Sequence, residues 1–192
     1  ANTKNALHYL NADPAGTAIT GNVTNVVFGL IKDYPEIVNG YTGVLAGEEQ
    51  DVPVYAYYVP NGSNYDVYML SNSTIYAPKD SNGLFRNMKA LKSLNTDNLD
   101  FSRTETMRNM VRDCQSLVTL DVSDWDTSNV KDMAYMFLSC YKLESINGLN
   151  NWDVSSVTDM TQTFAFCKVL PELDVSGWDV SNVTSMMGTF GQ

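Results

Sequence analysis

The phrase WDTSNVKDM at residues 125–133 recurs as WDVSSVTDM at 152–160 and as WDVSNVTSM at 178–186. The tryptophans that open the phrase stand at positions 125, 152 and 178, so the repeat steps are 27 and 26 residues. A phrase that recurs at such a step is typical of stacked repeats, because one unit cannot bury its apolar side alone. The sequence therefore predicts about four stacked repeats over 84–192, preceded by a separate N-terminal region, 1–83.

Several columns of the repeat are apolar and keep the same step, which predicts that their side chains form the core of the stack. The predicted core residues are Trp125, Trp152, Trp178, Met133, Met160, Met186, Phe137, Phe164, Cys114, Cys140 and Cys167. Leu99 stands where later repeats carry tryptophan, so the tryptophans are interpreted as the rim of this core. A strip of aromatic faces that stacks on sugars is the alternative.

Each repeat combines two periodicities. Met107, Met110, Val111 and Cys114 are spaced i, i+3, i+4 and i+7, which predicts one face of a short helix. The segment LVTLDVS at 117–123 is short and rich in β-branched residues, which predicts a strand. Equivalent strands of stacked repeats would form a parallel ladder with a spacing of about 4.8 Å. The expected architecture is a solenoid with one short strand and one short helix in each coil.

The N-terminal region is expected to seal the first coil, because solenoids need caps at their ends. Residues 52–78 alternate Val and Tyr and break at Asn61-Gly62, which predicts a β-meander. The stretch VTNVVFGLIKDYPEIVNG favours a strand and a short helix that ends at Gly40. Residues 1–22 carry no usable pattern and are expected to be disordered or extended. A separate ligand-binding module is the alternative to a cap.

The pattern M..MF..C..L..LDVS.WDTSNV..M resembles the repeat of BspA-like leucine-rich-repeat proteins, a bacterial surface-protein family that includes Listeria and Mycoplasma lipoprotein-type repeats. The resemblance implies an α/β fold, a right-handed leucine-rich-repeat-like solenoid with an N-terminal α+β capping region. It also implies an extracellular protein, displayed on the bacterial cell surface or secreted, that functions in adhesion. The chain stops just after Phe190 has opened a fifth round, so the parent protein is expected to continue with further repeats.

Charge and composition argue against several classes of function. The chain has 12 basic and 22 acidic residues and a net charge of −10, so nucleic acid and anionic membranes are poor partners. No run of about 20 apolar residues is present to span a membrane. The single histidine, His8, lies outside any catalytic motif, so the chain is not expected to be an enzyme.

No cofactor or metal site is predicted. The cysteines share one column with Met88, which favours buried free thiols over a disulfide or a zinc site. Asp126, Asp153 and Asp179 form a column of like charges at the tryptophan turn. Local backbone donors are favoured as the partners of these carboxylates, and a ladder of Ca²⁺ ions is the alternative.

The outward positions of the predicted strands form the candidate binding face, because side chains alternate along a strand. Its residues are Ser93, Asn95, Thr119, Asp121, Ser145, Asn147, Glu172 and Asp174. The face is polar and becomes more acidic along the chain, which suits a polar or basic partner, although the same residues could simply be solvated. The expected function is a monomeric module that recognises a host or microbial surface protein or glycan. The alternative is a passive spacer or wall scaffold that displays other domains.

Overall fold

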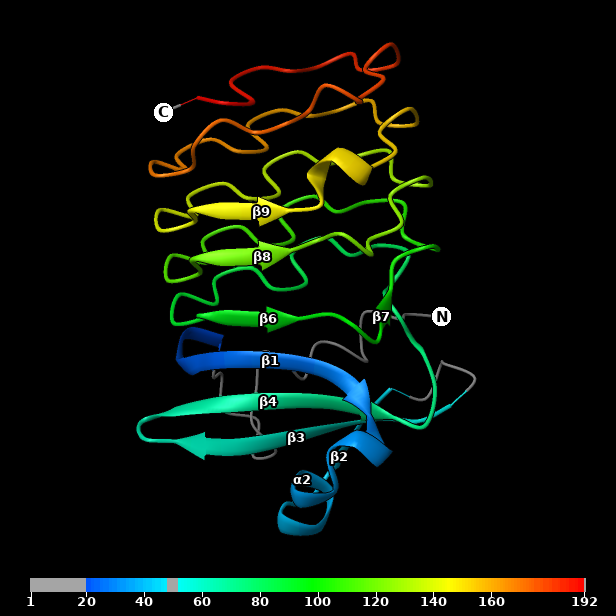
Figure 1. Cartoon of the computed structure of the whole chain (residues 1–192), viewed down its shortest axis with the longest axis vertical. Coiled ribbons are helices and arrows are strands. Elements are labelled where there is room, and N and C mark those ends of the chain that lie inside the picture. The colour runs from blue at the N-terminus through cyan, green and yellow to red at the C-terminus, as the bar shows by residue number, and fades with distance from the viewer. Residues whose placement is uncertain (1–19, 48–51, 192) are drawn as a thin grey trace.

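The computed structural model describes residues 20–47 and 52–191, so residues 1–19, and with them His8 and most of the segment 1–22, lie outside the description. Strands and turns dominate the described chain (Figure 1). The elements are η2 (Thr20–Asn22), β1 (Val23–Leu30), η3 (Ile31–Asp33), α2 (Pro35–Gly40), β2 (Val44–Gly47), β3 (Val54–Asn61), β4 (Asn64–Ser71), β5 (Ile75–Tyr76), β6 (Ser93–Asn95), β7 (Leu99–Asp100), β8 (Thr119–Asp121), β9 (Ser145–Asn147) and η4 (Leu149–Asn151).

Residues 20–76, which we call the N-terminal cap, are built on a mixed five-stranded sheet with the order β2-β3-β4-β1-β6. β3 and β4 form an antiparallel hairpin that turns at Gly62, whose φ of 63° lies in the region that glycine adopts without strain. β1 pairs in parallel with β4 on one side and with β6 on the other. Because β6 belongs to the first repeat, the cap sheet continues directly into the repeats.

The cap sheet is apolar on both faces. Phe28 and Met69 are fully buried and belong to the main core that continues through the repeats. On the opposite face Tyr57 and Leu70 pack with Ile37 of α2 in a second, smaller cluster. This two-sided burial explains why the cap strands read as nearly continuous apolar runs.

The repeats stack as layers beyond the cap, with β6, β8 and β9 side by side (Figure 1). We number the layers by residue range: layer 1 is 79–104, layer 2 is 105–130, layer 3 is 131–157, layer 4 is 158–183, and layer 5 is the partial range 184–191. Parallel bridges join equivalent positions from layer to layer: Asp80 to Thr106, Thr106 to Asp132, Asp132 to Asp159, and Asp159 to Ser185.

The predicted leucine-rich-repeat-like solenoid with a helix in each coil is wrong. Within residues 79–191 the helical element is η4, a three-residue 3-10 turn, and the segments 107–114 and 133–140 consist of consecutive turns. Left-handed residues recur every four positions in these segments, as at Asn109 (φ 55°) and Asp113 (φ 63°). One left-handed residue in each four breaks the run of right-handed dihedrals that an α-helix needs.

Backbone hydrogen bonds show how these turns replace the expected helix. The Met136 N–H donates within its own layer to Met133, at 3.2 Å. The next N–H, that of Phe137, donates across to the Thr163 carbonyl of layer 4, at 2.8 Å. Because local and cross-layer bonds alternate, helical spacing of apolar residues survives without a helix.

Layer 4 lacks the strand that layers 1 to 3 have at this position. Pro171 stands where layer 3 has Glu144, whose N–H donates to the Val118 carbonyl at 2.7 Å. Proline has no N–H to make the equivalent bond to layer 3, so the ladder β8-β9 ends there. The predicted strand around Glu172 and Asp174 is therefore an extended segment without strand pairing.

The core of the repeats is a set of side-chain columns. Met133, Met160, Phe137, Phe164 and the three cysteines are buried. In the partial layer 5, by contrast, Met186 is 46% exposed and Phe190 is 54% exposed, because no described layer packs over them.

Candidate functional site

Charge is segregated along one side of the repeats, at the ends of β6, β8 and β9. We define the acidic edge as residues 95–102, 121–128, 147–155 and 174–181, one segment from each of layers 1 to 4. These segments contain no lysine or arginine. Their carboxylates are Asp97, Asp100, Asp121, Asp124, Asp126, Asp153, Asp174 and Asp179, of which all but Asp100 are exposed. The nearest cation in the sequence, Arg103, is stacked over the Tyr76 ring at 3.7 Å.

Short local turns fix the orientation of these carboxylates. Asp121 Oδ1 accepts hydrogen bonds from the backbone N–H of Ser123, at 2.9 Å, and from its hydroxyl, at 2.6 Å. Asp174 and Ser176 repeat the pair at 3.1 and 2.7 Å. The spacing Asp-x-Ser produces this turn in layers 2 and 4, because an aspartate side chain readily accepts from the backbone two residues ahead.

The tryptophan-turn column behaves in the same way, which confirms the prediction of local backbone donors. Asp126, Asp153 and Asp179 accept from the N–H groups of the serines two residues ahead, at 3.0, 2.9 and 3.0 Å. The side-chain and backbone hydrogen bonds from Ser155 lower the pKa of Asp153. The Asp153 carboxylate therefore keeps its negative charge at neutral pH.

Two open grooves lie along the acidic edge. The larger, of about 380 Å³, is lined by Thr74, Asp97, Asp124 and Asp126 among others, at the junction of layers 1 and 2 with the cap. The smaller, of about 140 Å³, is lined by Ser145, Pro171, Glu172 and Asp174 among others. An open acidic groove can admit an extended cationic side chain such as lysine or arginine.

The predicted binding face overlaps this edge, because Asn95, Asp121, Asn147 and Asp174 belong to both. In β8 and β9, Thr119 is paired with Ser145 and Asp121 with Asn147. The exposed members of the face are Ser93, Thr119, Asp121, Asn147, Glu172 and Asp174, and the half-buried members are Asn95 and Ser145. Asp97 and Asp124 line the larger groove and are not members of the predicted face. The absence of basic residues from these segments is the signal that could have identified them.

The tryptophans lie beneath the edge as a buried ladder. Trp125 and Trp152 are 4% and 3% exposed, and their rings are 6.1 Å apart. Trp178 continues the stack at 6.2 Å and is half-buried. Trp152 Nε1 donates to the Val122 carbonyl at 3.3 Å, which ties its ring to the layer before it. Buried faces leave no room for a sugar at Trp125 or Trp152, so the sugar-stacking interpretation is wrong at these two positions.

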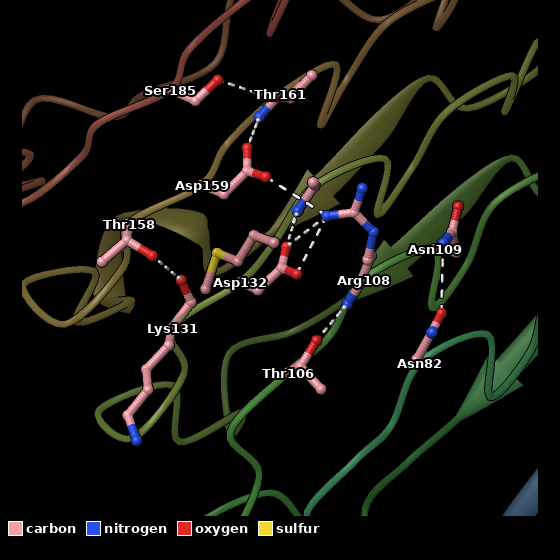
Figure 2. A network of polar contacts seen from close by, with 12 residues as sticks. Asn82, Thr106, Arg108, Asn109, Lys131, Asp132, Thr158, Asp159, Thr161 and Ser185 are labelled. Carbon is pink, nitrogen blue, oxygen red and sulfur yellow. Dashed lines mark hydrogen bonds and ion pairs between the residues drawn. The ribbon is translucent and has the colours of Figure 1, made fainter.

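A second polar cluster lies on the turn face, by which we mean the side formed by 106–113, 132–139 and 159–166, and its charged side chains contact one another across layers (Figure 2). Arg108 Nη1 lies 3.1 Å from Asp132 Oδ2 and 3.4 Å from Asp159 Oδ2, so one guanidinium joins layers 2, 3 and 4. Burial raises the pKa of Asp159, but hydrogen bonds from Thr161 and Arg108 outweigh it and leave the pKa below its usual value. Because one guanidinium contacts both carboxylates and offsets one of their two charges, the cluster serves as a pin between layers.

The three cysteines are free, buried thiols, as predicted. Each Sγ donates to a backbone carbonyl of the preceding layer, as from Cys114 to Phe85 at 3.1 Å. Burial raises the pKa of Cys114 to about 12 and that of Cys167 to about 11. Protonated thiols at these depths are neither nucleophiles nor good metal ligands at neutral pH.

No group of three or more His, Cys, Asp or Glu side chains in the described ranges could hold a metal ion. Within the same ranges no helix has the length and the apolar character to cross a bilayer.

Comparison with known proteins gives one match. The family model described as "Mycoplasma protein of unknown function, DUF285" matches residues 79–192, which is more than half of the chain and contains all of the described layers. Comparison with curated proteins gives no match. Comparison with solved structures gives none either.

Proposed function

Because the chain belongs to the family described as "Mycoplasma protein of unknown function, DUF285", we propose a function from its own surface: the acidic edge binds a basic partner. The module is non-catalytic and acts outside the cell, on the bacterial surface or in secreted form, as an adhesion module. We also propose that its repeats are related to those of BspA-like surface proteins. The partner class is a surface protein with exposed lysine and arginine, and a glycan is the less favoured candidate.

The observation that carries the proposal is the uncompensated charge of the edge. Carboxylates from four layers stand on one side of the repeats without a lysine or arginine among them. Like charges at layer spacing repel one another, and solvent or an approaching cation relieves that repulsion. On the turn face, by contrast, the Arg108 guanidinium lies between Asp132 and Asp159 and offsets one of their two negative charges. The edge is thus the surface that keeps the larger uncompensated charge for a partner.

The local turns give the edge a second advantage. Because Ser123 and Ser176 hold the carboxylates of Asp121 and Asp174 in place, little side-chain freedom is lost when a partner binds. A preorganised field of one sign also speeds the encounter with an oppositely charged partner.

The test is binding to a panel of immobilised matrix proteins, mucins and glycans, measured by biolayer interferometry at physiological salt. The edge variant is Asp124→Asn with Asp126→Asn, which removes two charges while the amide of residue 126 can still accept from Ser128. The matched control is Asp33→Asn with Glu36→Gln, which removes two exposed charges from the cap.

We expect saturable binding to basic members of the panel, weakened about five- to thirtyfold in the edge variant, at about 0.5–1 kcal/mol per lost charge. The control variant should bind as the wild type does. Equal binding by all three proteins contradicts the proposed site. Silence across the whole panel contradicts the proposed function and leaves the passive spacer as the better account.

A further inference from the structure

A second exposed surface lies at the opposite ends of the same strands. We define the aromatic corner as Tyr141 and Lys142 of layer 3 with Phe166, Lys168 and Val169 of layer 4, which precede β9 and its counterpart in layer 4. Tyr141, Phe166 and Val169 are 39%, 41% and 52% exposed. Lys168 Nζ lies 5.4 Å from the centre of the Tyr141 ring, so cation and aromatic ring form one patch.

The backbone at Phe166 is strained in a way that stability does not explain. Its φ is 59°, in the left-handed region, where the Cβ of a bulky side chain lies too close to the following carbonyl oxygen. Equivalent positions in layers 1 to 3 carry Asn87, Asp113 and Ser139, all short polar residues. An exposed phenylalanine adds little to the core, so packing within the isolated chain does not offset the backbone strain. Strain of this kind concentrates at positions where a side chain serves recognition.

The corner and the acidic edge are complementary in charge and lie on opposite sides of the layers. The corner stands at the tails of the strand arrows and the edge at their tips (Figure 1). Both surfaces step from layer to layer by the same strand spacing, about 4.8 Å. Two ladders with equal spacing can meet with several contacts at once.

We propose that the aromatic corner of one copy docks on the acidic edge of a second copy, side by side and with their layers in register. The inference rests on the proposed role of the acidic edge and names one partner for it. In this arrangement Lys142 approaches Asp153, since both belong to layer 3, and Lys168 approaches Asp179, since both belong to layer 4.

The apolar parts of the two surfaces agree with the same register. Val180 is 39% exposed on the layer-4 segment of the edge. Phe166 and Val169 belong to layer 4 of the corner, so the register that pairs the charges also covers these three side chains. The contact uses two different patches and therefore leaves each copy with one unused patch. Contacts of this kind extend into open rows unless the rotation between copies closes a ring.

The test uses two neutralising double variants and sedimentation velocity. The edge double variant is Asp153→Asn with Asp179→Asn, and the corner double variant is Lys142→Gln with Lys168→Gln. At low salt and at concentrations up to about millimolar, the wild type should form species larger than dimers. Each variant alone should sediment as a monomer. Their equimolar mixture should form a dimer and nothing larger, because it retains one intact corner and one intact edge.

A wild type that stays monomeric under these conditions overturns the proposal. So does assembly that persists in both variants and falls with Met187→Ser, because the contact would then lie on layer 5, where Met187 is 69% exposed. Binding of a lysine-rich peptide separates this inference from the proposed function. The corner double variant should bind the peptide as the wild type does, whether or not the chains assemble.

Discussion

In the cap, β3 and β4 are eight-residue strands that pair along their whole length, whereas β8 and β9 in the repeats have three residues each. The hairpin partners are close in sequence, while each repeat residue finds its partner about one repeat away. The cap is thus stabilised mainly by backbone ladders packed on two faces. The repeats depend on columns of equivalent buried side chains, so a defect in one column should lower the stability of the repeats more than their short strands suggest.

The largest expected effect breaks a column. Phe137 is fully buried, and its ring lies 5.4 Å from that of Phe164. Phe137→Ala should lower the free energy of unfolding by about 3–5 kcal/mol, through lost burial and the cavity left behind. Phe190→Ala, in the same column but 54% exposed, should cost less than about 1 kcal/mol. Urea denaturation measures both, and equal costs would contradict the column account.

The next prediction concerns how the stability of the repeats and of the cap depends on pH. Burial raises the pKa of Cys114 to about 12, while an unfolded thiol titrates near 8.5. The unfolded state therefore loses its proton first, and stability falls as pH rises above about 8.5. By pH 10 the loss should be about 1–2 kcal/mol for each such thiol.

Cys114→Ala should flatten this dependence in urea titrations between about pH 7 and pH 10. Burial also raises the pKa of Tyr57 and Tyr68 in the cap. Because tyrosines of the unfolded chain titrate only near pH 10 and above, the cap should lose stability at a higher pH than the repeats. An unchanged pH profile in the cysteine variant would show that the Cys114 thiol contributes no part of the loss.

A smaller effect tests the cross-layer pin. Arg108→Gln leaves Asp132 and Asp159 without their shared cation, and we expect a loss of about 1 kcal/mol, because the groups are partly solvated. Lys79→Gln, which removes a more exposed ion pair with Glu105, should cost less than about 0.5 kcal/mol. Thermal unfolding of the two variants at low and high salt measures the difference. If Lys79→Gln costs as much as Arg108→Gln, the pin has no special role.

The smallest effect has the opposite sign. Phe166→Asn replaces a strained residue by one that tolerates the left-handed region, so the isolated chain should gain up to about 1 kcal/mol. The same change should weaken the proposed assembly. A variant that is less stable than the wild type would show that Phe166 is held for packing within the layers.

The sequence predicted the repeat step and the apolar columns because both depend on local composition. It also predicted that the turn aspartates accept from nearby backbone, since the spacing Asp-x-Ser specifies such a turn. The helix prediction failed because apolar residues spaced i, i+3, i+4 and i+7 also face inward in consecutive turns. Asn109 and Asp113, residue types that tolerate positive φ, were the available warning.

The sequence predicted only part of the acidic edge and none of the aromatic corner. Asp121 and Asp174 were selected as outward strand residues, but Asp97 and Asp124 belong to turns whose direction the alternation of a strand does not predict. The charge segregation of the edge becomes visible only when four layers are aligned. The aromatic corner needed the backbone dihedral of Phe166, which its sequence neighbours do not indicate.

The most direct test of the account is the affinity of a lysine-rich peptide, measured by calorimetry at about 0.05 M and about 0.5 M salt. The wild type and the cap control, Asp33→Asn with Glu36→Gln, should bind at low salt and lose most of their affinity at high salt. The edge variant, Asp124→Asn with Asp126→Asn, should bind more weakly at low salt and show a shallower salt dependence. Identical salt dependence in all three proteins would contradict the claim that the acidic edge is the recognition surface.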